Sequence, residues 1–336
     1  MASRTIQHFR RWIGLGMLLL GFAIAAIALP VRSQSASPAV RLIQTNQCPA
    51  CDLQGANLSN ANLVGANISS SNLTGANLLG ADLRGANFSG TNLTDARLVN
   101  ADLRGANLTG ANLSRANLTS AQLQGAILFL INLSNADLDE ANLSGTDLSR
   151  IYLEQANLNN SNLSGTNLTG AEMFGVNLNN ANLNGAILNG ANLSGAMLRE
   201  SALRGAQMEG ISLRNANLTN ANLQGAFLLE ADLNNADFSF ANLTGAILNQ
   251  GILIQANLTA ADLTGASLVD AVLTNADFTN AVLAGAIIQG VEVTNTNFSG
   301  VDLTQVYLED VDFRQSNLCN ALLPDGTKGP CRRGRD

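Results

Sequence analysis

The chain carries an unbroken five-residue repeat through most of its length. From Cys51 to Asp325 it holds 55 consecutive pentapeptides, and no insertion or deletion shifts the frame. The third place is apolar, most often Leu, and the first place is usually Ala. The second place is mainly Asn or Asp, and the fifth favours Gly or Asn. Such a repeat sets the architecture, so it is interpreted before any local motif.

A period of five excludes an α-helix, because the apolar first and third places would scatter around the helical wheel. In an extended chain these two places share a face, but the next pair would point the opposite way unless the chain turned once per pentapeptide. Gly or Asn in the fifth place suits such a corner, since the third position of a type II turn needs positive φ. Four corners close a four-sided coil of about 20 residues.

Stacked coils give this chain its core. Large third-place and small first-place side chains alternate inside the coil and fill a narrow bore, while the other three places face water. Neighbouring coils pair their backbones at about 4.8 Å, which predicts about 13 to 14 coils in a rod about 65 Å long. The stable unit is the stack rather than the single coil.

The repeat resembles that of a known family. Residues 101–110, ADLRGANLTG, match the A(D/N)LXX consensus of pentapeptide repeat proteins, and the resemblance covers about four fifths of the chain. It implies an all-β fold, a right-handed quadrilateral parallel β-helix. It implies little about function, because the family includes DNA-mimicking topoisomerase inhibitors, exported proteins and members of unknown role.

Residues 1–33 are predicted to be a signal peptide or an uncleaved signal anchor. Arg4, Arg10 and Arg11 precede an uncharged apolar segment over residues 12–29, and Pro30 ends it. We expect cleavage near Ser33, although 18 apolar residues can also span a bilayer. The basic flank sends the repeats across the membrane in either case. A twin-arginine signal is disfavoured, because the residue before the arginine pair is Phe9.

The mature chain is acidic and contains no histidine. Removal of residues 1–33 takes away four arginines, no acid and the only histidine, His8, so the net charge falls from −7 to −11. Ser and Thr are plentiful, but the usual partners that activate a nucleophile are missing. A filled bore offers no pocket in which acid pairs such as Asp139-Glu140 or Glu309-Asp310 could shift their pKa values. We therefore expect no enzyme activity, no cofactor and no nucleic-acid partner.

The remaining segments are expected to protect the ends. Residues 34–50 form a linker and cap, in which Ser37-Pro38 can begin a short helix with Val40, Leu42 and Ile43 as its apolar residues. Such a helix would cover the open edge of the first coil. Residues 51–325 form the repeat domain. Residues 326–336 form a closing loop and a basic tail, and this ending also resembles that of exported cyanobacterial pentapeptide repeat proteins.

The four cysteines lie at the two ends of the repeats and predict disulfide bonds in an exported chain. Three pairings are formally open. Rod ends about 65 Å apart cannot be bridged when the two Cα atoms must lie within about 7 Å, which favours Cys48 with Cys51 and Cys319 with Cys331. A thioredoxin-like redox pair is the alternative for the first pair, but no βαβ pattern surrounds it. A shared zinc site is disfavoured because the rod separates the pairs, and no other metal site is expected.

One outer column of the coil is unusually apolar. Positions 20 apart stack on successive coils, and one second-place column carries large apolar residues, although Asp147, Asn167, Gln207 and Ser267 interrupt it. The opposite second-place column is polar apart from Met197. Bulky residues pack well along a β surface, which is the structural explanation; a protein-contact strip is the functional one. We call this column, with the neighbouring Phe129, the contact ridge, and its residues are Ile127, Phe129, Ile187, Phe227, Ile247, Ile287 and Tyr307.

The sequence thus favours an exported, non-enzymatic scaffold that binds an unidentified protein or a second copy of itself, with Cys48, Cys51, Cys319 and Cys331 in disulfides. The expected location is the periplasm or the thylakoid lumen, with membrane contact only through an uncleaved N-terminal segment. The alternative is a DNA-mimicking, topoisomerase-binding protein resembling the gyrase inhibitors of the family. Export disfavours that alternative, because gyrase is cytoplasmic.

Overall fold

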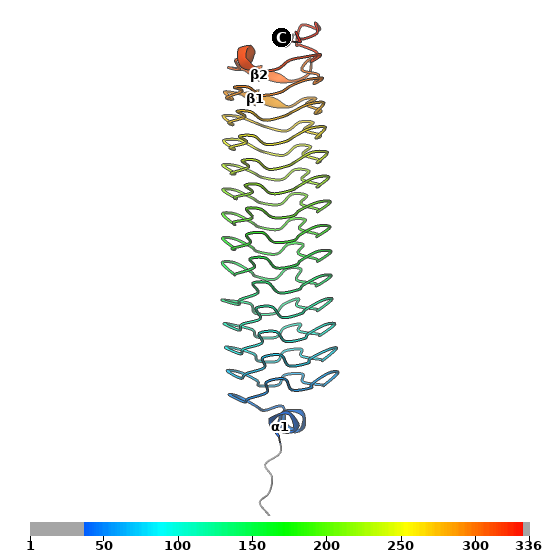
Figure 1. The fold of residues 1–336 in the computed structure, drawn as a ribbon, viewed down its shortest axis with the longest axis vertical. Coiled ribbons are helices and arrows are strands. Elements are labelled where there is room, and N and C mark those ends of the chain that lie inside the picture. The colour runs from blue at the N-terminus through cyan, green and yellow to red at the C-terminus, as the bar shows by residue number, and fades with distance from the viewer. Residues whose placement is uncertain (1–36, 332–336) are drawn as a thin grey trace, which may run out of the picture. The chain divides into compact units, whose positions relative to one another are not determined.

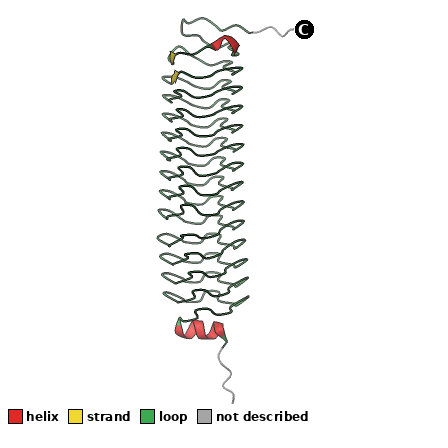
Figure 2. Cartoon of the chain, turned by 90° about the vertical axis from the view of Figure 1, so that its left-hand side faces the viewer, coloured by secondary structure: helices red, strands yellow, loops and turns green. Residues whose placement is uncertain are grey.

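The computed structural model describes residues 37–331. The predicted signal segment and the basic residues after Cys331 lie outside this range. The described residues belong to one compact unit of stacked coils, drawn between α1 and β2 in Figure 1. Its regular elements are α1 (Pro38–Thr45), β1 (Ile287–Gln289), β2 (Tyr307–Glu309) and the 3-10 helix η1 (Phe313–Gln315). Most of the coil is drawn as loop, because each face carries only a single bridge (Figure 2).

Parallel bridges join second-place residues that are 20 positions apart. Asn57 bridges Asn77, and Asn77 bridges Arg97. Next to each bridge, the third-place N–H donates to the second-place carbonyl of the following coil, as from Leu58 to Asn77 at 2.7 Å. The strand β1 pairs in parallel with β2 in the same register, Ile287 opposite Tyr307. This 20-residue register is the one that the pentapeptide frame predicts.

A turn ends each pentapeptide. The first-place N–H donates to the third-place carbonyl three residues earlier, as from Ala61 to Leu58 at 3.1 Å. The fifth-place residue between them has positive φ, 55° at Asn60 and 66° at Gly65. This is the backbone that the prediction of fifth-place Gly and Asn requires. Phe240 adopts the same conformation, with φ 58°, at a cost of about 1 kcal/mol that Gly would avoid.

The core is the column of third-place and first-place side chains inside the coils. Third-place residues such as Leu183 and Phe278 are fully buried, and so are first-place alanines. First-place hydroxyls are buried too, and they donate to backbone carbonyls, as Thr91 does to Ile68 at 2.9 Å. At the C-terminal end the rings of Phe278 and Phe298 stack at 5.2 Å between centroids. The hydroxyl of Thr91 is therefore paired, as an apolar interior requires.

Helix α1 covers the N-terminal end of the stack. Ser37 accepts a hydrogen bond from the N–H of Val40 at 3.4 Å, and Asn46 ends the helix in the left-handed conformation. Of the three apolar residues expected to face the coils, only Leu42 is buried, whereas Val40 and Ile43 are exposed. A helix of two turns has room for one anchor over a coil this narrow.

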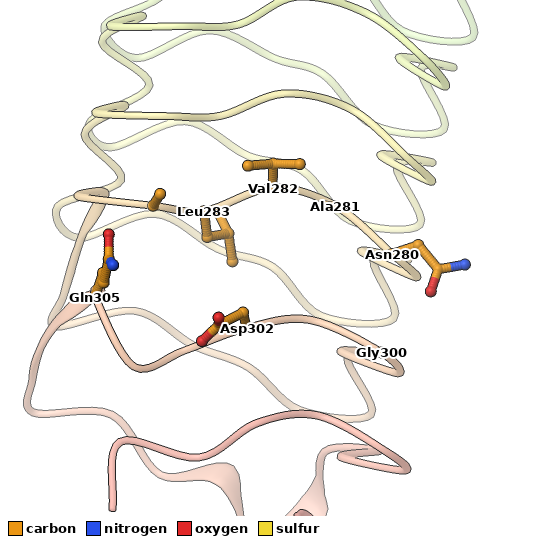
Figure 3. A pocket seen from close by; sticks show the side chains of 8 residues that line it. Asn280, Ala281, Val282, Leu283, Gly300, Asp302 and Gln305 are labelled. Carbon is orange, nitrogen blue, oxygen red and sulfur yellow. The ribbon is translucent and has the colours of Figure 1, made fainter. Parts of the chain in front are cut away.

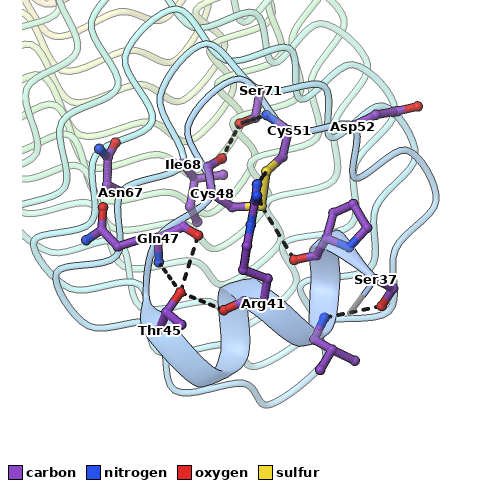
Figure 4. The surroundings of a disulfide bond; sticks show 12 residues. Ser37, Arg41, Thr45, Gln47, Cys48, Cys51, Asp52, Asn67, Ile68 and Ser71 are labelled. Carbon is purple, nitrogen blue, oxygen red and sulfur yellow. Dashed lines mark hydrogen bonds between the residues drawn. A yellow bond between two sulfur atoms is a disulfide. The ribbon is translucent and has the colours of Figure 1, made fainter. Parts of the chain in front are cut away.

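The disulfide Cys48–Cys51 lies between α1 and the first coil (Figure 4). Both cysteines are buried, and Arg41 of α1 contacts both sulfur atoms, with 3.2 Å between its Nη2 and the Sγ of Cys48. The second disulfide, Cys319–Cys331, closes the loop at the other end. The described cysteines thus form two local pairs, one at each end of the stack.

Regular coiling stops before the pentapeptide frame does. Although the sequence frame runs to Asp325, residues 313–315 form η1, where Asp312 accepts a hydrogen bond from the N–H of Arg314 at 3.0 Å. Farther along, Leu322 bridges Lys328 in an antiparallel pair, so the chain folds back over the last coil. No following coil offers backbone partners at this end, and the local turns replace them.

Candidate protein-contact surface

Second-place Asn and Asp residues have a structural role in the turns. In the polar column opposite the contact ridge, the side-chain oxygen accepts a hydrogen bond from the fourth-place N–H two residues later, as at Asn117 (3.0 Å) and Asp277 (2.8 Å). The same contact is present at all eight polar residues of this column, namely Asn117, Asp137, Asn157, Asn177, Asn217, Asp237, Asn257 and Asp277. The frequent Asn and Asp are thus explained as local caps of the turn.

The opposite column is also tied together along the stack. The amide of Asn157 donates to Asp137 at 2.9 Å, and the amide of Asn177 donates to Asn157 at 2.9 Å. Farther along, the amide of Asn257 donates to Asp237 and that of Asn297 to Asp277, both at 3.0 Å. This polar column therefore satisfies much of its hydrogen-bonding capacity within the protein.

The contact ridge has no such internal role. The column that contains it keeps one register from Asp147 to Tyr307, and each pair of residues 20 positions apart in this range is bridged. Phe227 and Tyr307 are 47% and 56% exposed, whereas Ile187 and Ile247 are half-buried. Within the described chain, the N–H groups of Asn189 and Leu229 have no hydrogen-bond acceptor, because an apolar side chain precedes them by two residues. Apolar residues here give up a turn cap and expose hydrophobic surface.

Ile127 and Phe129 are separated from the rest of the ridge by a break in the ladder. Ile127 bridges Asn107, but the expected bridge from Ile127 to Asp147 is missing. The N–H groups of Leu128 and Leu130 have no partner in the described chain. A cavity of about 190 Å³ opens there between the two coils. Ile127 and Phe129 therefore lie apart from the bridged part of the column, beyond the interruption at Asp147.

Two stacked isoleucines lie on the two coils that the break separates, and we attribute the break to them. Ile131 and Ile151 both occupy the first place, 20 residues apart, where most coils have Ala, and both are fully buried. Two bulky side chains on successive coils overfill the bore and push the coils apart. Ile211 has alanines at both neighbouring positions, Ala191 and Ala231, and its ladder is intact. The coils of Ile131 and Ile151 keep the bridge from Asn132 to Tyr152 and lose the one from Ile127 to Asp147, whereas the isolated Ile211 leaves its ladder unbroken.

We expect the amides of Leu128 and Leu130 to exchange with deuterium at least about tenfold faster than those of Leu108 and Gly110, because only the latter pair is hydrogen-bonded to the next coil. Hydrogen exchange resolved to single residues measures this. Ile151→Ala should restore much of the protection by removing the overfilled contact. Equal protection of the two pairs in the native protein would contradict the break.

Comparisons with known proteins identify the family. The family model described as pentapeptide repeats (8 copies) matches residues 51–250 and 256–323, which is more than half of the chain. The chain belongs to the pentapeptide repeat family.

Solved structures similar to this pentapeptide repeat chain come from cyanobacteria and a plant. HetL, involved in heterocyst differentiation regulation in Nostoc sp. strain PCC 7120, is 30% identical over 71% of this chain and 91% of its own, with a TM-score of 0.35. A pentapeptide repeat protein of the Arabidopsis thaliana thylakoid lumen is 37% identical over 30% of this chain and 68% of its own, with a TM-score of 0.24. Another from Cyanothece 51142 is 30% identical over 38% and 90%, with a TM-score of 0.26. Comparison with curated proteins gave no match.

In this pentapeptide repeat chain, two arginines and two aspartates on successive coils pair with one another. Arg84 pairs with Asp82 at 2.6 Å and Arg104 with Asp102 at 2.6 Å, and Arg84 also approaches Asp102. Hydrogen bonds from these arginines hold the pKa values of Asp82 and Asp102 below their usual range. Asp139, Glu140 and Glu309, considered as acid pairs, instead accept side-chain hydrogen bonds on the surface.

One of the described cavities lies at the C-terminal end, beside η1 and Pro330, and the others are lined by residues of neighbouring coils. The one in Figure 3 has a volume of about 300 Å³ and lies where the bridge from Val282 to Asp302 is missing. Asp302 accepts hydrogen bonds from the N–H and hydroxyl of Thr304, and its pKa is lowered by the hydroxyl and then by the N–H. Within residues 37–331, no group of three or more His, Cys, Asp or Glu side chains is placed to hold a metal ion. We likewise find no helix there with the length and hydrophobicity that a bilayer crossing requires.

Several exposed apolar residues lie outside the contact ridge. They occupy second, fourth and fifth places on other faces or corners. A search of these three places for large apolar side chains would predict them from the sequence. Tyr152 adjoins the break, since it bridges Asn132 of the preceding coil. The others in the described repeats are scattered along the coils: Val64, Leu130, Phe174, Met197, Phe240, Ile252 and Val282.

Proposed function

We propose that the chain is an exported, non-enzymatic scaffold of the pentapeptide repeat family that binds a protein through the contact ridge. Its repeats would form a right-handed, four-sided coil of about 13 to 14 turns. The observation that carries the proposal is the loss of turn caps along the ridge, where apolar side chains replace the Asn or Asp that the turn prefers. A departure from the local rule without a structural gain is typical of a functional surface.

The part of the ridge from Phe227 to Tyr307 supports a contact best. Phe227 and Ile247 are bridged neighbours, and Ile287 and Tyr307 pair through β1 and β2. Ile127 and Phe129 are exposed but lie across the broken ladder, so they form a separate apolar spot.

Export of the chain rests on the sequence of residues 1–33, with the periplasm or the thylakoid lumen as the destination. A chain without a cleaved signal would remain attached to the membrane by that segment alone.

The alternative, a DNA-mimicking protein that binds a topoisomerase, is supported by the acidic balance of the chain. The pairing of Asp82, Asp95 and Asp102 with arginines interrupts any anionic surface in the N-terminal third. Recovery of the mature protein from the cytoplasm would favour this alternative over an exported scaffold.

Photo-crosslinking in the native compartment tests the ridge. We expect a photoreactive phenylalanine analogue at position 227 to crosslink a discrete protein, because that side chain is exposed on the ridge. The same analogue at position 217, on the opposite polar column, is the matched control. Equal crosslinking from both positions, or none from position 227, would count against the ridge as the contact surface.

A further inference from the structure

Residues 215–313 carry only negative charge. Between Asn215 and Phe313 there are 11 acidic residues and no lysine or arginine. Arg214 and Arg314, just outside this stretch, pair with Asp232 and Asp312 at its two ends. None of the other nine acids forms a salt bridge in the described chain. They are Glu230, Asp237, Asp262, Asp270, Asp277, Glu292, Asp302, Glu309 and Asp310.

Many of these acids gather at one edge of the contact ridge. Glu230, Asp270 and Asp310 are fifth-place residues that follow ridge positions by three residues, and all three are exposed. They share one column on alternate coils, with Gln250 and Gly290 between them, and the Asp270 side chain reaches the next coil at Gly290. Glu309 also belongs to this edge and accepts a hydrogen bond from the hydroxyl of Tyr307 at 2.7 Å. We call this edge, with Glu230, Asp270, Glu309 and Asp310, the acidic corner.

The other edge of the ridge is neutral and small. The fifth-place residues that precede the ridge are Gly225, Gly245, Gly265, Gly285 and Gln305. An apolar strip therefore runs between a flat glycine edge and an anionic edge. The asymmetry favours a partner with an apolar stripe and positive charge on one flank.

We propose that the ridge from Phe227 to Tyr307 docks a cationic amphipathic helix of a partner protein. This inference rests on the proposed function and adds the chemistry of the partner. The four ridge residues Phe227, Ile247, Ile287 and Tyr307, with Ser267 between the middle two, occupy five successive coils that span about 19 Å at 4.8 Å per coil. This is the length of about 13 helical residues at 1.5 Å each. A helix parallel to the stack repeats its apolar side chains every 5.4 Å, close to the coil spacing. Lysine or arginine on one flank of that helix would meet the acidic corner.

A labelled 14-residue helical peptide with a leucine stripe and lysines along one flank tests the inference on the full chain by fluorescence anisotropy. We expect the triple variant Glu230→Gln, Asp270→Asn, Asp310→Asn to bind the peptide about tenfold more weakly, with the difference shrinking at high salt. The matched control, Asp237→Asn, Asp262→Asn, Asp277→Asn, removes three charges from other faces and should bind as the native chain does.

Equal weakening in both triple variants would mean that only net charge acts, and it would overturn the docking proposal. Equal binding of a peptide with glutamine in place of lysine would overturn it too. A dimer that forms through the ridge and excludes the peptide would make a second copy the occupant, against the proposal. If no peptide binds while position 227 still crosslinks a protein, the scaffold function is retained and the cationic helix is rejected as the partner. If the peptide does not bind and position 227 crosslinks nothing, both proposals are rejected.

Discussion

Leu183→Asp is expected to destabilise the middle of the stack severely. Leu183 is fully buried, and its neighbours on adjacent coils, Leu163 and Leu203, are third-place residues that are also buried. The bore is apolar, and no cation of the described chain lies within it. Loss of the leucine costs about 2 to 3 kcal/mol of burial, and the buried carboxyl adds the cost of an unpaired polar group or forces its own protonation.

Because each coil contacts only its neighbours, the damage should weaken both interfaces of the coil that holds Leu183 and uncouple the segments on its two sides. We expect a lower midpoint of thermal unfolding, by at least about 10 °C for a loss of several kcal/mol, and a transition that is broader or split. Circular dichroism and calorimetry measure both. Asn182→Asp, at the neighbouring half-buried outer position, is the matched control and should unfold close to the native temperature. Near-native unfolding of Leu183→Asp would contradict a filled bore.

The fold could be predicted from the sequence because one rule recurs in every pentapeptide. The third-place Leu, the first-place Ala and the fifth-place Gly or Asn each have the role in the structure that the five-residue period demands. Local redundancy of this kind makes the sequence consistent at every level. Ser37 and Pro38 predict the start of the capping helix. They do not predict that, of its three apolar residues, Leu42 alone is buried. Burial over an irregular end depends on geometry that a short pattern does not contain.

The surface was harder to predict, because it depends on contacts between coils. We attribute the break beside Ile127 to Ile131 and Ile151. Both fit the apolar pattern of the first place, and their combined size is noticed only when residues 20 apart are compared. The structural role of Asn117 and its column was also missed. Without the turn hydrogen bonds, a polar second place looks like ordinary solvated surface, and the apolar ridge looks like packing along a β surface. The hydrogen bonds show the structural role of the polar column, which the sequence pattern alone does not.

Replacing three apolar ridge residues with asparagine is expected to raise the stability of the fold and to weaken binding of the partner protein. The triple variant Ile187→Asn, Phe227→Asn, Ile247→Asn gives the N–H groups of Asn189, Leu229 and Asn249 a side-chain acceptor two residues earlier, as at Asn117. Each new turn hydrogen bond should stabilise the fold by up to about 1 kcal/mol. The same change removes the apolar strip, so crosslinking from position 287 should fall at least about tenfold.

The reciprocal variant Asn157→Ile, Asn177→Ile, Asn217→Ile provides the control. It removes three turn caps and breaks the amide ladder, so the urea midpoint of unfolding should fall while crosslinking from the ridge persists. If the ridge served only to pack the β surface, its conversion to asparagine would instead lower the urea midpoint and leave crosslinking intact. A rise in stability together with a loss of contact is the combination that only a binding surface explains, because a surface kept for stability would not sacrifice its turn caps.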